Sequence, residues 1–330
     1  MRTPFRLSAA PWFTAMAAGL FFLSAMPALA DACGTGVSMS ATAVAFRPDY
    51  DFTDGAQHTT VVTSLRVMGV VAGCTYLVGA EGGNGGRKMS DGSAHTANYQ
   101  LYTNSQLTDV FLDPLNGASG TDVNMLSFVG GSATTVTLMY YFTMPSGQYV
   151  PSGLYQDDVL LTLYSGTFLE PSPPIDSVSA IHEATVTGIF LVSLVPTGSA
   201  FDINRTSIVT DFGTLSPGQS RSVQALFKSN DSVGYKVYMR SDNASRLKAA
   251  TGTASIPYSV TLSPSDSPNL AAVAANPALT QTDIQVASGT GVAPSSADRL
   301  NVTATIGSFS VPALAPGTYS DVITVTIVGN

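Results

Sequence analysis

Hydrophobic and polar residues alternate in short runs along most of the chain after residue 30. These runs are rich in Val, Ile, Thr and aromatic residues, and Gly, Pro, Asn, Asp and Ser separate them. Such runs are typical of β-strands joined by turns. The clearest runs span 59–67, 134–142, 159–164, 188–195 and 322–328. Many short strands with turn residues between them predict an all-β protein built as a sandwich.

The second half of the sequence repeats the first at a nearly constant spacing. Residues of the same type recur 159 positions apart in three pairs, Tyr76 with Tyr235, Arg87 with Arg246, and Tyr99 with Tyr258. Near the end of each copy, Gly153-Leu-Tyr-Gln-Asp157 is matched by Gly317-Thr-Tyr-Ser-Asp321, at a spacing of 164. Two copies of one β domain are therefore predicted, over 31–168 and 184–330. The Pro-rich stretch 169–183 is predicted to be a semi-stiff linker between them.

Residues 1–30 have the features of a secretory signal peptide. Arg2 and Arg6 precede an apolar run at 13–25, and the small residues of Ala28-Leu29-Ala30 resemble a cleavage site. An uncleaved membrane anchor is the alternative interpretation, which Pro27 and the cleavage triplet disfavour. No later stretch has 18 uninterrupted apolar residues, so the mature protein is not expected to span a membrane.

Export changes the interpretation of the cysteines. Cys33 and Cys74 are the only two in the chain, and both lie in the first copy. In an oxidising compartment a disulfide between them is expected, closing a loop of about 40 residues worth roughly 3–4 kcal/mol. A reactive thiol would need an activating base, and the sequence offers none nearby.

Charge and composition exclude several functions. Only 11% of the residues are charged and the formal net charge is −8, with no cluster of Lys or Arg. A nucleic-acid partner is therefore not expected, nor is a polybasic membrane-binding patch. With two Cys and three His, no metal site and no cofactor are predicted.

The sequence predicts no enzyme. His58, His95 and His182 are isolated in polar, turn-like stretches and are expected to be solvated loop residues. No nucleophile elbow, phosphate-binding loop or zinc-protease motif is present. A carbohydrate-active enzyme would need paired carboxylates, for which Asp109, Asp113 and Asp122 are the nearest cluster. Their turn-like context favours hydrophilic loop ends.

The first copy contains two unusually apolar connecting stretches, 107–117 and 121–128. The counterpart in the second copy is rich in Ala, Ser and Thr and lacks aromatic residues. Exposed apolar loops suggest a contact surface, whereas short extra strands packed inside the sandwich are an equally weighted alternative. The residues predicted for the contact surface are Phe111, Leu112, Leu115, Met125 and Leu126.

The order of motifs resembles the spore coat protein U domain family, which includes the subunits of archaic (Csu-type) chaperone–usher pili. In the first copy the resemblance rests on Cys33, on Cys74 followed by Tyr76, and on the Gly-x-Tyr-x-Asp strand entry at 153–157. Arg87-Lys-Met89 and Asn98-Tyr-Gln-Leu-Tyr102 also match. The second copy matches at 212–215, Tyr258 and 316–322 but has no cysteines.

The resemblance implies immunoglobulin-like sandwiches, of which the pilin domain lacks its last strand. A two-domain member resembles a pilus-tip adhesin that is secreted through the periplasm to the cell surface and mediates attachment and biofilm formation. The implied partners are a periplasmic pilus chaperone, an outer-membrane usher, an adjacent pilin subunit that donates a strand, and an abiotic or host surface. A secreted coat or matrix protein built from the same domains is the alternative.

The end of the second copy is consistent with this expectation. It stops directly after the strand at 322–328, whereas the first copy continues for about twenty residues beyond its equivalent strand. Ile323, Val325 and Ile327 share one face of that strand and are expected to point into the core beside a gap. The alternative is that this strand simply completes the sandwich.

Overall fold

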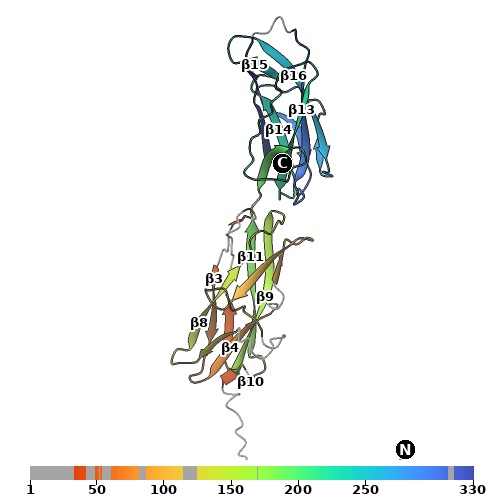
Figure 1. Cartoon of the computed structure of the whole chain (residues 1–330). Helices are drawn as coiled ribbons and strands as arrows, with labels where there is room; N and C mark the ends of the chain where they lie inside the picture. The colour runs from red at the N-terminus through yellow and green to blue at the C-terminus, as the bar shows by residue number, and fades with distance from the viewer. Residues whose placement is uncertain are drawn as a thin grey trace, which may run out of the picture.

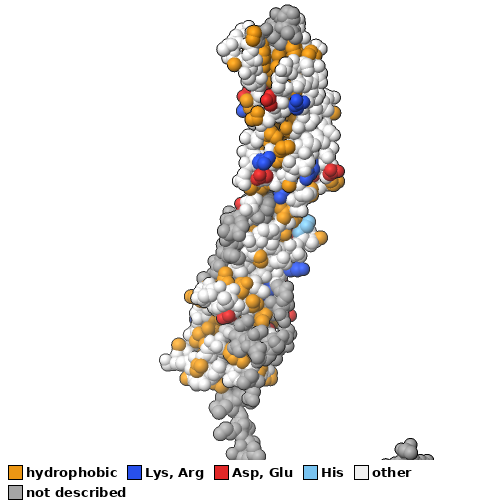
Figure 2. Space-filling view, viewed as in Figure 1, with side chains coloured by type: hydrophobic (Ala, Val, Ile, Leu, Met, Phe, Trp, Pro, Cys, Tyr) orange, Lys and Arg blue, Asp and Glu red, His pale blue; other side chains and the backbone are white. Residues whose placement is uncertain are grey.

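The computed structural model describes residues 33–41, 49–51, 53, 61–81, 87–113, 125–168, 170–310 and 316–330. The predicted signal peptide lies outside these residues. Within them the chain is built almost entirely of strands, which confirms the all-β prediction. None of their helices is long and apolar enough to cross a membrane. Figure 1 shows two β domains joined end to end, and Figure 2 shows charged side chains scattered sparsely over one face of both.

In the first domain the pairing path runs β1-β3-β8-β6-β5-β9-β11-β2, so one hydrogen-bonded path wraps around the core. β4 pairs with β7 and β9, and β10 pairs with β9. The strands are β1 (Ser38–Ala41), β2 (Asp49–Tyr50), β3 (Val61–Met68), β4 (Thr75–Ala80), β5 (Arg87–Ser90), β6 (Thr96–Tyr102), β7 (Leu126–Val129), β8 (Thr135–Thr143), β9 (Gly153–Thr167), β10 (Glu170–Pro171) and β11 (Asp176–Val186).

The second domain has two separate sheets, in the orders β12-β13-β19-β16-β15-β20 and β17-β18-β14-β21. Its strands are β12 (Phe190–Pro196), β13 (Ser220–Ser229), β14 (Tyr235–Ser241), β15 (Arg246–Ala249), β16 (Ser255–Ser265), β17 (Leu270–Ala272), β18 (Ile284–Gly289), β19 (Asp298–Ile306), β20 (Tyr319–Ser320) and β21 (Ile323–Gly329).

Each domain has its own apolar core, formed by alternate residues of its strands. Leu65 and Tyr140 from one side of the first domain meet Tyr76 and Leu161 from the other, and all four are fully buried. A separate cluster that includes Phe227 and Leu300 fills the second domain. Burial of alternate side chains is what the period-2 pattern predicts for strands with one face on a core.

The sequence repeat corresponds to equivalent strands. The Tyr99 hydroxyl donates a hydrogen bond of 2.5 Å to Asp157, and its counterpart Tyr258 donates one of 2.6 Å to Asp321. The first hydrogen bond ties β6 to β9, and the second ties β16 to Asp321, which lies just before the start of β21. The repeated residues therefore hold the same place in both domains.

The predicted linker at 169–183 is wrong. β11 spans Asp176–Val186 and pairs antiparallel with β9 along its whole length, from Asp176↔Leu163 to Val186↔Gly153. Ala180 and Ala184 are buried by this pairing. Pro171 lies in β10 and pairs with Gly166 of β9, whereas Pro173 and Pro174 lie between β10 and β11. The connection between the domains is the short stretch 187–189.

Candidate functional site

Among the described residues, no strand of the second domain corresponds to β11 of the first domain. β21 pairs antiparallel with β14, with Val237↔Ile327 and Met239↔Val325 opposite each other. Its counterpart β9 pairs with β4 in the same register at the repeat-equivalent positions. The other side of β9 is covered by β11, over eleven residues. No described residue pairs with the corresponding side of β21.

Burial of equivalent side chains differs accordingly. In β9, Val159, Leu161 and Leu163 are 3%, 0% and 0% exposed. Their counterparts at a spacing of 164, listed in the same order, are Ile323, Val325 and Ile327. These three contact the second core but are only half-buried. The side chains thus share one apolar face of β21, and that face is incompletely covered.

β12 lies beside this edge. It contacts β21, and the ring of Phe190 lies close to Gly329, but the two strands form no β pairing among the described residues. In the first domain β11 contacts the equivalent first strand, β1. A strand added to β21 would therefore have to pass between β21 and β12.

The predicted contact surface in the first domain is wrong for three of its five residues. Phe111 is 0%, Met125 7% and Leu126 9% exposed. Phe111 packs on Tyr140 with the ring centres 5.5 Å apart, inside the main core. The structure thus agrees with the alternative of packing against the sandwich.

Met125 and Leu126 lie in different apolar clusters. Leu126, at the start of β7, belongs to the main core, whereas Met125 packs with Leu77 and Tyr164 in a small second cluster. Leu112 is half-buried, and Leu115 lies outside the described residues. The apolar character of these stretches is therefore explained largely by burial.

Buried polar groups anchor the segment that contains Phe111. The guanidinium of Arg87, 3% exposed, donates to the carbonyl oxygens of Ala80, Glu81 and Phe111. Its pKa is lowered by desolvation. Asp113 is also buried and accepts a hydrogen bond of 3.0 Å from the Tyr164 hydroxyl, so it is not the hydrophilic loop end that was predicted.

The backbone of Asp113 can lie close against β4 because residue 79 is a glycine. A Cβ added at Gly79 on β4 would lie 2.9 Å from the Cα of Asp113. The sheet can be approached this closely only where the side chain is absent. Asp109, by contrast, is exposed and bonds to Asn104, and Asp122 lies outside the described residues.

The histidine prediction is wrong for His182, which is 1% exposed in the core of the first domain. Its Nδ1 lies 2.9 Å from the Ala180 carbonyl oxygen, so that nitrogen is the donor. Nε2 lies 3.1 Å from the Tyr140 hydroxyl, and the ring stacks on Phe142. Burial is the main cause that lowers the pKa of His182 to about 4. His95 is exposed, and His58 lies outside the described residues.

The predicted disulfide is confirmed. Cys33 and Cys74 are joined, with their Cα atoms 5.7 Å apart. The bond ties the segment before β1 to the start of β4, at the end of the first domain far from the second domain (Figure 1).

A shallow groove of about 380 Å³ lies beside the disulfide, lined by Gly34, Thr35, Ser165, Ser172, Pro173, Pro174 and Ile175. None of these described lining residues is charged. Across the described part of the chain, no three His, Cys, Asp or Glu side chains are grouped as a metal site would require.

Residues 20–162 match the family model of the Spore Coat Protein U domain. The match ends within β9, so β11 and the whole second domain lie beyond it. No curated protein sequence matches the chain.

Solved structures similar to the chain include several pilus adhesins. One is the chaperone–tip adhesion subunit pre-assembly complex of archaic chaperone–usher Csu pili from Acinetobacter baumannii, at 11% identity over 88% of this chain and 99% of that chain (TM-score 0.45). Another is the CupB6 tip adhesin of Pseudomonas aeruginosa, at 10% identity over 88% and 92% (TM-score 0.34). A third is CfaE, the adhesive subunit of the CFA/I fimbria of enterotoxigenic Escherichia coli, at 12% identity over 89% and 81% (TM-score 0.34).

Proposed function

We propose that this protein is an adhesin subunit of a chaperone–usher pilus. In this proposal the second domain joins the pilus by accepting a β-strand at the free edge of β21. The first domain, which carries the Spore Coat Protein U match, makes the contact with an abiotic or host surface.

The observation that carries the proposal is the difference between the two copies at this edge. Among the described residues, β9 pairs with β11 on one side and with β4 on the other, and its apolar residues are buried. β21 pairs only with β14, and its equivalent residues are only half-buried. An edge strand presents unpaired backbone N–H and C=O groups, which readily pair with another chain. Strand addition supplies main-chain hydrogen bonds, and alternate side chains fill the pockets between neighbours.

In this proposal two partners supply, one after the other, the strand that is added to β21. A periplasmic chaperone covers the edge first, and an adjacent pilin subunit replaces it at an outer-membrane usher. The protein then resides at the tip of a cell-surface pilus and contributes to biofilm formation. Burial of Phe111, Met125 and Leu126 argues against these residues as the adhesive contact. The proposal places that contact at the end of the first domain farthest from the second, where the groove beside the disulfide lies.

The first domain offers a strand of suitable register for an experiment. In β11, Val178 lies opposite Leu161 and Ala180 opposite Val159, the counterparts of Val325 and Ile323. We expect a copy of Asp176–Val186, joined after Asn330 through a short turn, to fold back antiparallel on β21. The full chain with this extension should be more soluble and monomeric and should melt at a higher temperature than the unextended chain.

The matched control is the same extension with Val178→Asp and Ala180→Asp in the copied strand. Charges at these inward positions would be desolvated without partners, so this extension should give no gain. Size-exclusion chromatography and thermal unfolding of the three proteins provide the comparison. Equal behaviour of the two extensions would contradict the assigned edge and register.

A further inference from the structure

We propose that the two domains form one rigid unit, locked by a hydrogen-bonded joint in which Asn230 and Tyr149 each cross from one domain to the other. The joint is separate from the free edge of β21. The inference therefore does not depend on the proposed pilus function.

The covalent connection is too short to act as a free tether. β11 ends at Val186 and β12 begins at Phe190, so only residues 187–189 separate the two domains. Both ends of this stretch are fixed, because Thr187 donates to the Tyr50 carbonyl and Ile189 donates to the Asn230 side chain. The connection is thus held on the first domain at one end and on the second domain at the other, which leaves little chain between them to flex.

Asn230 of the second domain is 0% exposed, and its side-chain hydrogen bonds all go to the first domain or the connection. Its Nδ2 donates to the carbonyl oxygens of Val150, at 3.2 Å, and Thr187, at 2.9 Å. Its Oδ1 accepts from the Ile189 N–H at 2.7 Å. The Asn230 carbonyl also accepts from the Ser152 N–H at 2.7 Å. The amide thus uses both its donor hydrogens and its acceptor across the joint.

Tyr149 makes the reverse crossing. Its hydroxyl lies 2.8 Å from the carbonyl oxygens of both Ser229 and Ala293 in the second domain. These two acceptors are already tied together, because the Ala293 N–H donates to the Ser229 carbonyl. Desolvation raises the pKa of Tyr149 to about 12, so the hydroxyl keeps its proton near neutral pH.

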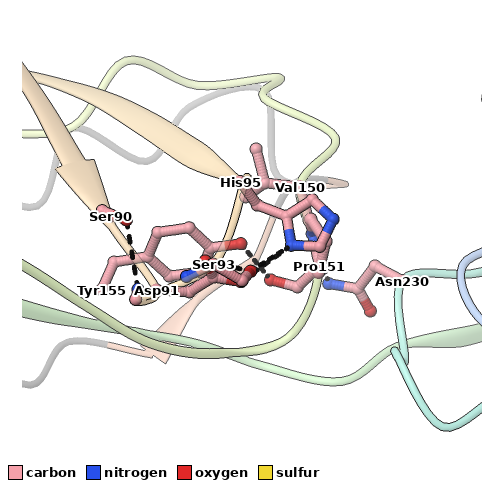
Figure 3. A network of polar contacts seen from close by, with 9 residues as sticks. Ser90, Asp91, Ser93, His95, Val150, Pro151, Tyr155 and Asn230 are labelled. Carbon is pink, nitrogen blue, oxygen red and sulfur yellow. Dashed lines mark hydrogen bonds and ion pairs between the residues drawn. The ribbon is translucent and has the colours of Figure 1, made fainter.

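The loop that carries Tyr149 is itself held firmly on the first domain. The Tyr155 hydroxyl donates to the Pro151 carbonyl at 2.9 Å, and Gln148 exchanges two hydrogen bonds with the backbone of Asn98. Figure 3 shows Asn230 reaching toward Val150 and Pro151, with the turn that carries Asp91 and His95 alongside. A fixed loop on one side and a fully buried amide on the other make the joint resistant to bending.

The inference is tested by single-molecule energy transfer on the full chain. Dyes are attached at Lys88→Cys and Lys248→Cys, two exposed positions in the first and second domains. The native cysteines are in a disulfide and do not react. We expect a single narrow efficiency distribution for the otherwise native chain. Asn230→Ala, which removes three of the crossing hydrogen bonds, should widen the distribution and shift its mean.

Two further variants keep the test decisive. Asn204→Ala, at an exposed position of the second domain, should leave the narrow distribution unchanged. Tyr149→Phe keeps the ring and removes only the crossing hydroxyl, so it should widen the distribution even if Asn230→Ala fails to fold. A broad distribution for the native chain would overturn the inference. So would crossing variants that fold and remain as narrow as the Asn204→Ala control.

Discussion

Replacing Phe111 with serine should lower the free energy of unfolding of the first domain by about 4 kcal/mol, in the range measured for large-to-small changes at buried aromatic residues. The ring is fully buried on Tyr140, and the backbone of Phe111 pairs with Leu101 and accepts a hydrogen bond from Arg87. Truncation leaves a cavity in a segment that cannot easily collapse. Urea unfolding of the full chain, followed at the first-domain transition, measures the loss.

Val129→Ser is the matched control, because Val129 lies in the same region but is 65% exposed. A surface change of this kind should alter stability by less than about 0.5 kcal/mol. Surface attachment of Phe111→Ser should then fall only in proportion to the unfolded fraction. Lost attachment with unchanged stability would instead restore Phe111 as an adhesive residue and contradict its burial.

The first domain should also lose stability in acid because of His182. Burial lowers the pKa of its ring to about 4, whereas the ring titrates near ~6.5 in an unfolded chain. The unfolded state therefore binds more protons between these values. The contribution of His182 is complete above pH 6.5, declines as the pH falls, and is lost below pH 4, a total of about 3 kcal/mol.

A comparison of variants isolates the contribution of His182 from that of the carboxylates elsewhere in the chain. His182→Gln should flatten the dependence of unfolding free energy on pH between 6.5 and 4, whatever its effect on stability at neutral pH. Gln106→Ala, at an exposed position of the first domain that carries no titratable group, should keep the native slope. Equal slopes for the native chain and His182→Gln would show that the ring is not a buried, neutral group.

The repeat made much of the fold predictable from the sequence. Tyr99 and Tyr258 recur because each donates to an aspartate at the start of the same strand or its equivalent. The constant spacing of the repeat therefore indicated, from the sequence alone, that these residues occupy equivalent positions in the two domains. The disulfide was also predictable, because the sequence has only two cysteines and a predicted signal peptide that indicates an oxidising compartment.

The alternation typical of a strand is present in the sequence of β11, but the prolines that precede it favoured a linker. Val178, Ala180, Ala184 and Val186 follow the alternation of a strand, but their small side chains give a weak apolar signal and the preceding prolines suggested a linker. His182 continues the same inward-facing series. A polar residue in that series is not distinguishable from a loop residue until the opposite strand is known.

The apolar stretches of the first copy could not be assigned from sequence. Met125 is buried because it packs with Leu77 on the outer face of β4, whereas Phe111 is buried because it packs on Tyr140 in the main core, and both are tertiary properties. The close approach of Asp113 to Gly79 and the hydrogen bond from Arg87 to Phe111 settle the position of the segment. Neither contact can be predicted from the local pattern of hydrophobic residues or from secondary-structure propensity.

Amide hydrogen exchange on the full chain tests the free edge of β21 most directly. We expect the amides of β9 that point toward β11 to be protected, and the amides of β21 that point away from β14 to exchange quickly. Adding the extension copied from Asp176–Val186 should protect those β21 amides and leave β9 unchanged. If the β21 amides are already as protected as those of β9 in the unextended chain, the edge is not free and the proposed strand acceptance is contradicted.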